Sequence, residues 1–307
     1  MSLAKITFAK GSGGLGKAAP GEDYISGLLF YGTSPFGNEE VKQFFSLEEA
    51  EAAGIDPEAV ETEVLHYHIS EYFRINPAGS LYVGVFAGNV DAEKLVDLQQ
   101  EADGKLRQVG VYLADATFAA EDSETIDALA TSFNAVCKTL EDEYYTPLSV
   151  LLAPNIHGLD LGTLPDLSES SDNKVSVVIG QDGAGKGAAL YGTKQKSITC
   201  LGAALGTVSK AAVHENIGWV NKFDVSGAEL NSIAFANGED VKTKKNTELD
   251  GIDDKNYIFL QKHVGVSGSY FNGSWTASSG DYENIELNRV IDKAIRGIRE
   301  MMLPNLN

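Results

Sequence analysis

The sequence predicts an α/β protein: a mostly parallel sheet flanked by helices, with an additional mixed α+β region and an extended N-terminal arm. Short apolar runs alternate with segments of helical periodicity between residues 26 and 153. These runs are almost continuously apolar, which is typical of parallel strands buried on both faces. Asn, Asp and Gly turns are then frequent over 218–270. We therefore expect an arm at 1–22, an α/β core domain at 23–175 and a region at 176–307 that closes the core.

The first 22 residues are expected to form an arm and linker. Ile6, Thr7 and Phe8 lie in a β-like run, and glycines dominate residues 11–16. These glycines match GxGxxG, but a dinucleotide-binding fingerprint needs a helix that starts within it, and Pro20 prevents a long one. We therefore expect a strand-forming tip on a flexible tether.

The core elements follow in order along the chain. The expected strands are 26–32, 81–87, 109–113 and 148–153, and the expected helices are 46–53, 57–76, 92–101 and 123–140. Ser46 and Glu49 form a capping box at the first helix, and Asp56 followed by Pro57 marks the start of the second. This βαβαβ order predicts helices on both faces of the sheet.

The C-terminal region has fewer regular elements. We expect a strand at 175–180, a helix rich in small residues at 198–211, short strands such as 257–260, and a terminal helix at about 284–302. The terminal helix has the clearest pattern. Its apolar stripe is Ile291, Ala294, Ile295, Ile298 and Met302, while another face carries Arg289, Lys293, Arg296 and Glu300.

Charge distinguishes the chain ends from the body. The chain has 44 acidic and 24 basic residues, a net charge of −20, which argues against binding nucleic acid or anionic lipid. Residues 1–19 contain lysines and no acid, residues 289–307 are also basic, and residues 39–74 are strongly acidic. Either end could be attracted to the body of another copy; chance clustering of solvated charges is the alternative.

The chain shows no sign of a membrane span or an export signal. No apolar stretch approaches bilayer length, and the N-terminus lacks the apolar core of a signal peptide. Cys137 and Cys200 have no metal-ligand spacing and fit buried thiols in a reducing compartment. We therefore expect a cytoplasmic protein without membrane insertion.

One loop suggests nucleotide chemistry, and we test it as an alternative. Gly180–Gly187 follows an expected strand and matches GxxxxGK, the start of a phosphate-binding loop. Its eighth position is Gly187, where a hydroxyl should bind Mg²⁺, so a nucleotide-binding α/β enzyme is the weaker hypothesis. His66 and His68 are two residues apart on a helix and cannot bind one metal together. We expect no catalytic site, cofactor or metal.

The last 130 or so residues resemble a known family. The resemblance rests on Tyr257–Leu260, Gly265–Asn272, Asp281–Ile285 and the helical pattern Arg-Val-x-Asp-Lys-Ala-x-Arg at 289–296. Segments 175–182 and 197–221 are similar to the same family. The family is the tail-sheath proteins of contractile phages, of the Mu-like and Bacteroidetes types.

This resemblance implies a structural subunit that self-assembles in rings around an inner tail tube, produced in the bacterial cytoplasm and found in a phage-tail-like or prophage particle. The alternative within the same machine is a baseplate or adaptor component. The candidate assembly-interface residues are Ile6, Thr7 and Phe8, for strand addition to another copy, and Arg289, Lys293 and Arg296. Sheath proteins of this type continue beyond the terminal helix, so we expect a sheath-like core, either a minimal variant or a truncated form.

Overall fold

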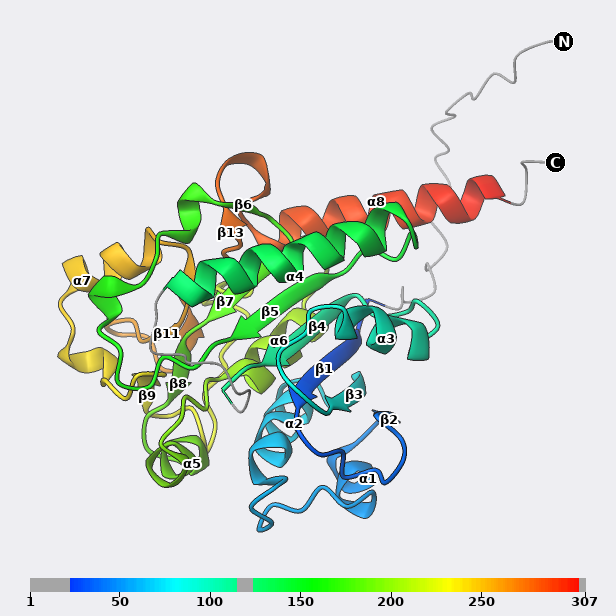
Figure 1. The fold of residues 1–307 in the computed structure, drawn as a ribbon. Helices are drawn as coiled ribbons and strands as arrows, with labels where there is room; N and C mark the ends of the chain where they lie inside the picture. The colour runs from blue at the N-terminus through cyan, green and yellow to red at the C-terminus, as the bar shows by residue number, and fades with distance from the viewer. Residues whose placement is uncertain (1–22, 115–123, 304–307) are drawn as a thin grey trace, which may run out of the picture.

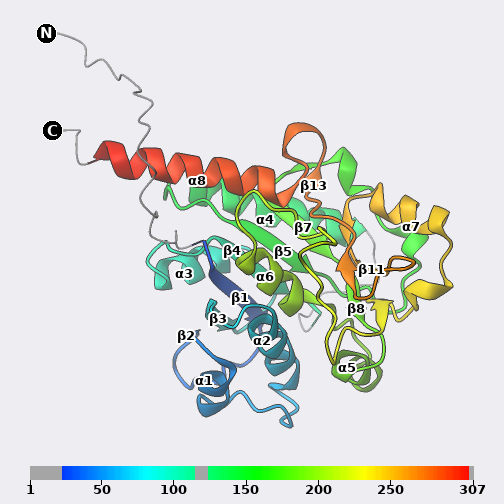
Figure 2. The same cartoon turned by 180° about the vertical axis from the view of Figure 1, so that it is seen from behind.

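A seven-stranded sheet lies at the centre of the molecule (Figures 1 and 2). The computed structural model describes residues 23–114 and 124–303, so the expected arm at 1–22 lies outside the described residues. Neighbouring strands are parallel except β2 and β3, which are antiparallel. In spatial order the strands are β10 (Tyr257–Ile258), β7 (Val175–Val178), β5 (Ser149–Ala153), β4 (Gln108–Tyr112), β1 (Ile25–Tyr31), β3 (Ser80–Phe86) and β2 (Val41–Phe44).

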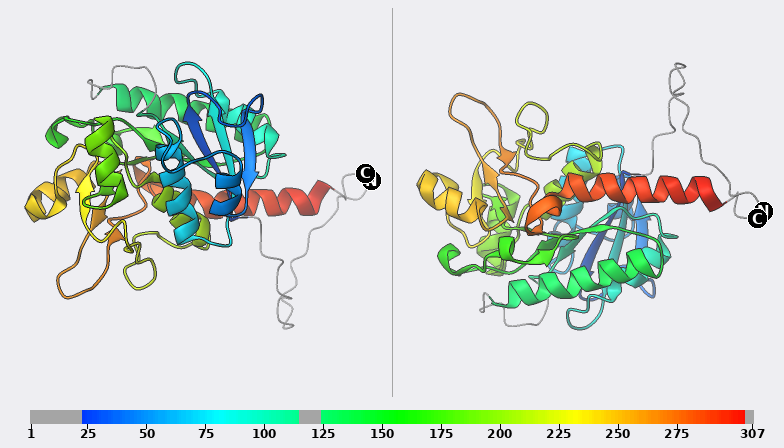
Figure 3. Two further views of the ribbon diagram at one scale, coloured as in Figure 1. Left: turned by 90° about the horizontal axis from the view of Figure 1, so that it is seen from below. Right: turned by 90° about the horizontal axis from the view of Figure 1, so that it is seen from above.

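Helices cover both faces of this sheet, as the views from below and from above in Figure 3 show. The predicted fold class is therefore confirmed. Helices α3 and α4 pack on one face, and α6 packs on the other with α2 beside it. The helices are α1 (Leu47–Ala52), α2 (Glu63–Ile75), α3 (Lys94–Glu101), α4 (Glu124–Asp142), α5 (Lys186–Lys194), α6 (Leu201–Lys210), α7 (Asn246–Asp253) and α8 (Ile285–Met302).

The mixed region forms small antiparallel sheets beside the main one. They pair β8 (Gly180–Asp182) with β9 (Ile233–Phe235), β11 (Leu260–Gln261) with β12 (Tyr270–Phe271), and β6 (Ser171–Asp172) with β13 (Ala277–Ser278). Short 3₁₀ turns occur at Leu161–Thr163, Leu167–Glu169, Val241–Thr243 and Gly280–Tyr282. Because β7, β10 and α6 belong to the main sheet and its cover, the C-terminal region completes the core begun by the N-terminal strands.

Two predicted boundaries were wrong for local reasons. Asp56 does not cap α2, which begins at Glu63. The Thr62 hydroxyl donates to the Asp56 carbonyl (2.8 Å) and accepts from its N–H (3.0 Å), which closes the intervening residues into a turn that competes with helix. The strand expected at 175–180 divides after Val178, because Gly180 already pairs in the β8–β9 sheet.

Helices α2 and α6 approach closely because two glycines face α2. A Cβ atom at Gly202 would lie 2.1 Å from the His68 carbonyl oxygen, and one at Gly206 would lie 2.8 Å from that of Tyr72. No side chain fits in that space, so the small-residue pattern of α6 allows this backbone contact.

Helix α8 crosses the amino-terminal ends of the parallel strands. Lys174, which precedes β7, and Asp23, which precedes β1, both contact α8. The C-terminal half of the helix projects beyond the body of the molecule (Figures 1 and 3). The buried residues of the helix, Ile285, Asn288, Arg289 and Asp292, all lie in its first half.

Candidate assembly interface

The inward face of α8 is polar, and buried charges hold it to the core. Lys174 Nζ lies 2.6 Å from Asp292 Oδ1 and 2.9 Å from Glu141 Oε2 on α4. Burial alone would lower the pKa of Lys174, but the two carboxylates outweigh it and the pKa is raised. Burial raises the pKa of Asp292, partly opposed by Lys174. The lysine therefore joins α8, α4 and the start of β7 through one buried ionic cluster.

Arg289 belongs to this buried face and not to the surface. Its side chain is 4% exposed, and both terminal guanidinium nitrogens donate to the Ala211 carbonyl at 3.3 Å, just after α6. Burial lowers the pKa of Arg289 to about 10, which leaves it charged at neutral pH. The expected role of Arg289 in direct contact with another copy does not fit this burial, because its charge is used within the subunit.

Lys293 and Arg296 meet on one carboxylate. Both contact Asp23, the first described residue, and Arg296 does so at 3.2 Å. The Lys293 side chain is 46% exposed and that of Arg296 is 15% exposed. These two cations therefore hold the first described residue of the chain to α8, and Lys293 also faces solvent.

The outward face of α8 is apolar, the reverse of the usual arrangement for an amphipathic helix. The predicted stripe is present, but Ile291, Ile295 and Ile298 are 39%, 43% and 58% exposed. The reason is that the opposite face of α8 carries Asp292 and Arg289, which bind Lys174 and the Ala211 carbonyl in the body of the subunit. Other exposed apolar residues on or next to the helix are Leu287, Val290, Met301, Met302 and Leu303.

A shallow groove continues this apolar face. About 450 Å³ in volume, it lies between the projecting half of α8 and Tyr145 and Pro147, which follow α4. The Arg299 guanidinium stacks 3.6 Å from the centre of the Tyr145 ring, and Tyr145 is itself half-exposed. An exposed apolar surface of this extent is typical of a protein–protein contact site.

The loop Gly180–Gly187 binds a carboxylate of the chain itself where a phosphate would lie. Asp182 is fully buried and accepts from the N–H groups of Ala184, Gly185 and Gly187 at 2.8–2.9 Å. Burial raises the pKa of Asp182, against the lowering effect of these hydrogen bonds. The N–H groups at the start of α5 that would hold a phosphate are thus already satisfied.

Glu229 completes this arrangement by accepting from the Lys186 N–H at 2.5 Å. Helix α5 begins at Lys186, within this loop, and runs past Gly192 to Lys194. The aspartate two residues into the loop is the signal that could have indicated an internal cap.

Other chemistry-bearing residues are part of the core. His68 is fully buried, which lowers its pKa to about 3, and its Nδ1 accepts from the Gly202 N–H at 3.3 Å. Burial raises the pKa of both thiols, that of Cys137 to about 12. Within residues 23–114 and 124–303, no group of three His, Cys, Asp or Glu side chains has metal-site geometry, and no helix could cross a bilayer.

The fold is similar to that of contractile sheath subunits of known structure. The contracted helical sheath of the anti-feeding prophage is 15% identical, with a TM-score of 0.61 over 98% of this chain and 78% of that one. The baseplate structure of the same prophage is 15% identical, with a TM-score of 0.58 over 98% of this chain and 77% of that one. The contracted PVC sheath complex of an extracellular contractile injection system is 12% identical, with a TM-score of 0.59 over all of this chain and 75% of that one.

A family model described as DUF2586, N-terminal domain, matches residues 3–274, and the chain belongs to this family. No curated protein sequence matches the chain.

Proposed function

We propose that this chain is a subunit of a contractile sheath that assembles in rings around an inner tube. The observation that carries the proposal is α8, a projecting helix whose apolar face points outward on a fold shared with sheath subunits. In a free subunit this face is in water, at a cost of about 25 cal/mol for each Å² of apolar surface. Contact with a neighbouring copy would remove that cost, so the helix fits a subunit built for assembly.

Extended chain ends would link the copies. The segment Ile6, Thr7 and Phe8 would add as a strand to a neighbour, with main-chain hydrogen bonds supplying affinity. Asp23 on Lys293 and Arg296 would fix the base of this arm. Arg289 keeps a role inside the subunit, so the surface candidates on α8 are Lys293 and, to a smaller extent, Arg296. The subunit would be made in the cytoplasm of the producing cell and end in the particle.

A baseplate component is the second candidate, favoured by the similarity to a baseplate structure. The two roles differ in assembly, because a sheath subunit extends into tubes whereas a baseplate part stops at one ring. Catalysis is not part of the proposal, since the loop that suggested nucleotide binding is filled by Asp182.

The test is negative-stain electron microscopy and sedimentation of the concentrated protein with the variant Ile298→Asp. The wild type should form rings or tubes, and Ile298→Asp should remain a folded monomer by circular dichroism. The matched control is Val264→Asp, which alters a fully exposed apolar residue on a loop far from α8 and should assemble normally. Normal assembly of Ile298→Asp would contradict the role of α8, single rings without tubes would favour the baseplate role, and a wild type that stays monomeric would contradict self-assembly.

A further inference from the structure

The groove beside the projecting half of α8 has the shape and size to receive an aromatic side chain. Ile295, Ile298 and Met302 line it at spacings of three and four residues, which place them on one side of the helix. Tyr145 belongs to the opposite wall. The groove measures about 450 Å³, and a cavity of roughly 150 Å³ is already enough to bind benzene, so a phenyl ring has room here.

One charge of the groove, that of Arg299, has no ionic partner among the described residues. Of the other charged side chains in the lining, Glu141 is paired with Lys174 and Arg296 with Asp23. Arg299 instead stacks on the Tyr145 ring, and no carboxylate within residues 23–114 and 124–303 forms an ion pair with it. The groove therefore favours an apolar group that is accompanied by a carboxylate.

Exposed apolar residues outside α8 and the residues that border it differ in the charge beside them. Several stand next to a lysine: Val60 next to Lys194, Trp219 next to Lys222, and Val264 with Val266 on the same loop as Lys262. The contact at Val60 is direct, because Lys194 Nζ donates to its carbonyl at 2.8 Å. A cation at the inserted residue would be repelled by Arg299, so these residues do not match the groove.

Phe45 is an exposed apolar residue with acids beside it. Its side chain is 55% exposed. The Glu49 carboxylate accepts from the Phe45 N–H at 2.8 Å, which holds a negative charge at the base of the aromatic side chain. Glu48 is also exposed and lies in the first turn of α1. Phe45 and these acids together are the chemical complement of the α8 groove.

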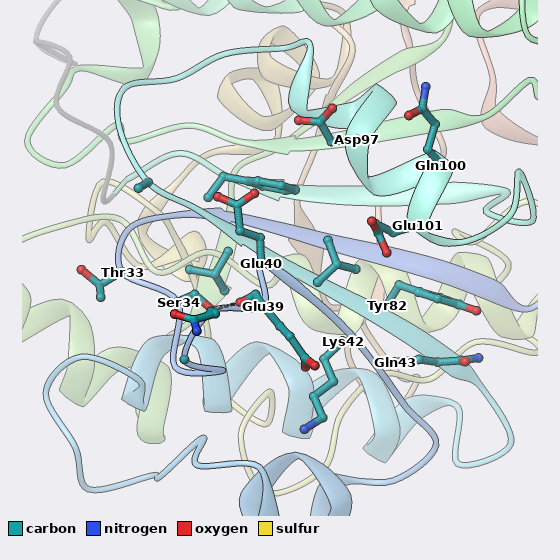
Figure 4. A pocket seen from close by; sticks show the side chains of 16 residues that line it. Thr33, Ser34, Glu39, Glu40, Lys42, Gln43, Tyr82, Asp97, Gln100 and Glu101 are labelled. Atoms are coloured by element: carbon teal, nitrogen blue, oxygen red, sulfur yellow. Dashed lines mark hydrogen bonds between the residues drawn. The ribbon is translucent and has the colours of Figure 1, made fainter.

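The acidic surface continues along β2, the strand that ends just before Phe45. This strand is the last of the sheet, and no described strand pairs with its outer side. A second groove, of about 890 Å³, borders this open edge, and its charged lining is Glu39, Glu40, Asp97, Glu101 and a single lysine, Lys42 (Figure 4). Even with Asp97 paired to Lys94 at 2.8 Å, acids exceed cations around this edge.

We propose that Phe45 of one copy inserts into the α8 groove of the next copy and brings its neighbouring carboxylates to Arg299. Figures 1 and 2 show α8 and α1 on opposite sides of the molecule, so one subunit cannot join its own two surfaces. Each copy would give Phe45 to one neighbour and receive it from another, a head-to-tail contact that generates rings or open helices. The inference rests on the proposed self-assembly and names the surface that covers the apolar face of α8.

Photo-cross-linking of the full-length protein tests the contact. Phe45 is replaced with p-benzoylphenylalanine, an aromatic residue that bonds to nearby C–H groups on irradiation. Assembled particles are irradiated, and cross-linked peptides are identified by mass spectrometry. Mixing isotope-labelled with unlabelled copies shows whether a link joins two chains. We expect links between chains to residues 295–303 or 145–147.

The matched control places the same photoreactive residue at Val60, which is exposed on the same acidic part of the chain. It should not link to residues 295–303 or 145–147. Links from position 45 to other segments only, or no links in assembled particles, would overturn the proposal. Equal linking from positions 45 and 60 to the α8 groove would indicate unspecific proximity and overturn it as well.

Charge exchange tests the ionic part of the contact and leaves Phe45 in place. Arg299→Glu should raise the protein concentration needed for assembly about tenfold or more, because it would face carboxylates of the neighbour. Adding Glu48→Arg to the same chain should restore assembly, since every contact would again join opposite charges. Glu48 is used because Glu49 is needed for the Phe45 N–H. Circular dichroism confirms that each variant is folded.

The control pair Arg299→Glu/Glu58→Arg has the same net charge and reverses another exposed acid of the same part of the chain. It should not restore assembly. Equal rescue by both pairs would show an effect of net charge alone and overturn the assigned partner.

Electron microscopy of the same samples separates this inference from the proposed function. If Ile298→Asp blocks assembly while Phe45→Ala forms normal rings or tubes, the groove has another occupant, and this inference is overturned while the sheath role stands. If the wild type forms neither rings nor tubes, the proposed function and this inference are both overturned. Loss of assembly in Phe45→Ala with a native circular dichroism spectrum, together with the expected cross-link, would support the contact.

Discussion

Replacing Lys174 by Met should destabilise the subunit strongly, because it removes the cation that pairs with the carboxylates of Asp292 and Glu141. Asp292 is 4% exposed at its side chain and depends on Lys174 at 2.6 Å, whereas Glu141 is 27% exposed and can turn to water. Breaking a buried pair by removing one partner costs about 3 to 5 kcal/mol. For a chain of this size, roughly 2 °C per kcal/mol gives a fall in Tm of about 6 to 10 °C.

The double variant Lys174→Met/Asp292→Leu provides the comparison for a thermodynamic cycle. Replacing both ions with apolar groups removes the unpaired charge, so most of the lost stability should return, to within about 1 kcal/mol of the wild type. Urea unfolding followed by circular dichroism measures both variants. The reasoning would be refuted if Lys174→Met cost less than about 1 kcal/mol, or if the double variant were no more stable than the single one.

Three other predictions concern the core. Burial lowers the pKa of His68 from 6.5 to about 3, so between these two pH values the unfolded chain binds more protons than the folded one. The free energy of unfolding should therefore fall as the pH drops through this window, by about 2 kcal/mol at pH 5. The variant His68→Gln should show a smaller fall when urea unfolding is measured at several pH values. An unchanged acid dependence would count against this assignment. Asp182→Ala should cost about 2 to 4 kcal/mol by the same method, because several backbone N–H groups lose their acceptor, and Mg²⁺–ATP should give no calorimetric binding to the wild type. Tight ATP binding would instead favour an enzyme. Gly202→Ala should cost about 3 kcal/mol or more, since its Cβ would strike a backbone oxygen, whereas Gly192→Ala, with open space around it, should be neutral or slightly stabilising; similar effects of the two would contradict the close contact of α2 and α6.

Elements with strong local patterns were predictable from the sequence. The buried strand at Ile25–Tyr31 contains the apolar run Leu28–Tyr31. Helix α1 follows from its N-cap, since the Glu49 N–H donates to the Ser46 hydroxyl at 3.3 Å and the Glu49 carboxylate accepts from the Phe45 N–H at 2.8 Å. Strand β2 was missed because its four residues are short and half polar, which is the usual character of an edge strand. Propensity gives little signal in such a segment, and its pairing with β3 decides its conformation.

The candidate interface was only partly predictable for the same reason. The sequence identifies α8 as amphipathic, but periodicity does not say which face packs inward. That choice depends on Lys174 and the Ala211 carbonyl, which lie far from α8 in the sequence and need its charged face. Likewise the GxxxxGK pattern cannot show that Asp182 occupies its own loop.

The sequence by itself determined the strand and helix order, the basic ends around an acidic body, and the alternation of residues 5–8, because these depend on neighbours along the chain. Tertiary structure decided that α8 turns its apolar stripe outward, that Arg289 is buried, and that an acidic groove borders an open strand edge. Each of these depends on contacts between segments that are distant in the sequence. An unpaired buried charge costs more free energy than exposed apolar surface, so the pairing of buried charges decides which face of a helix packs inward.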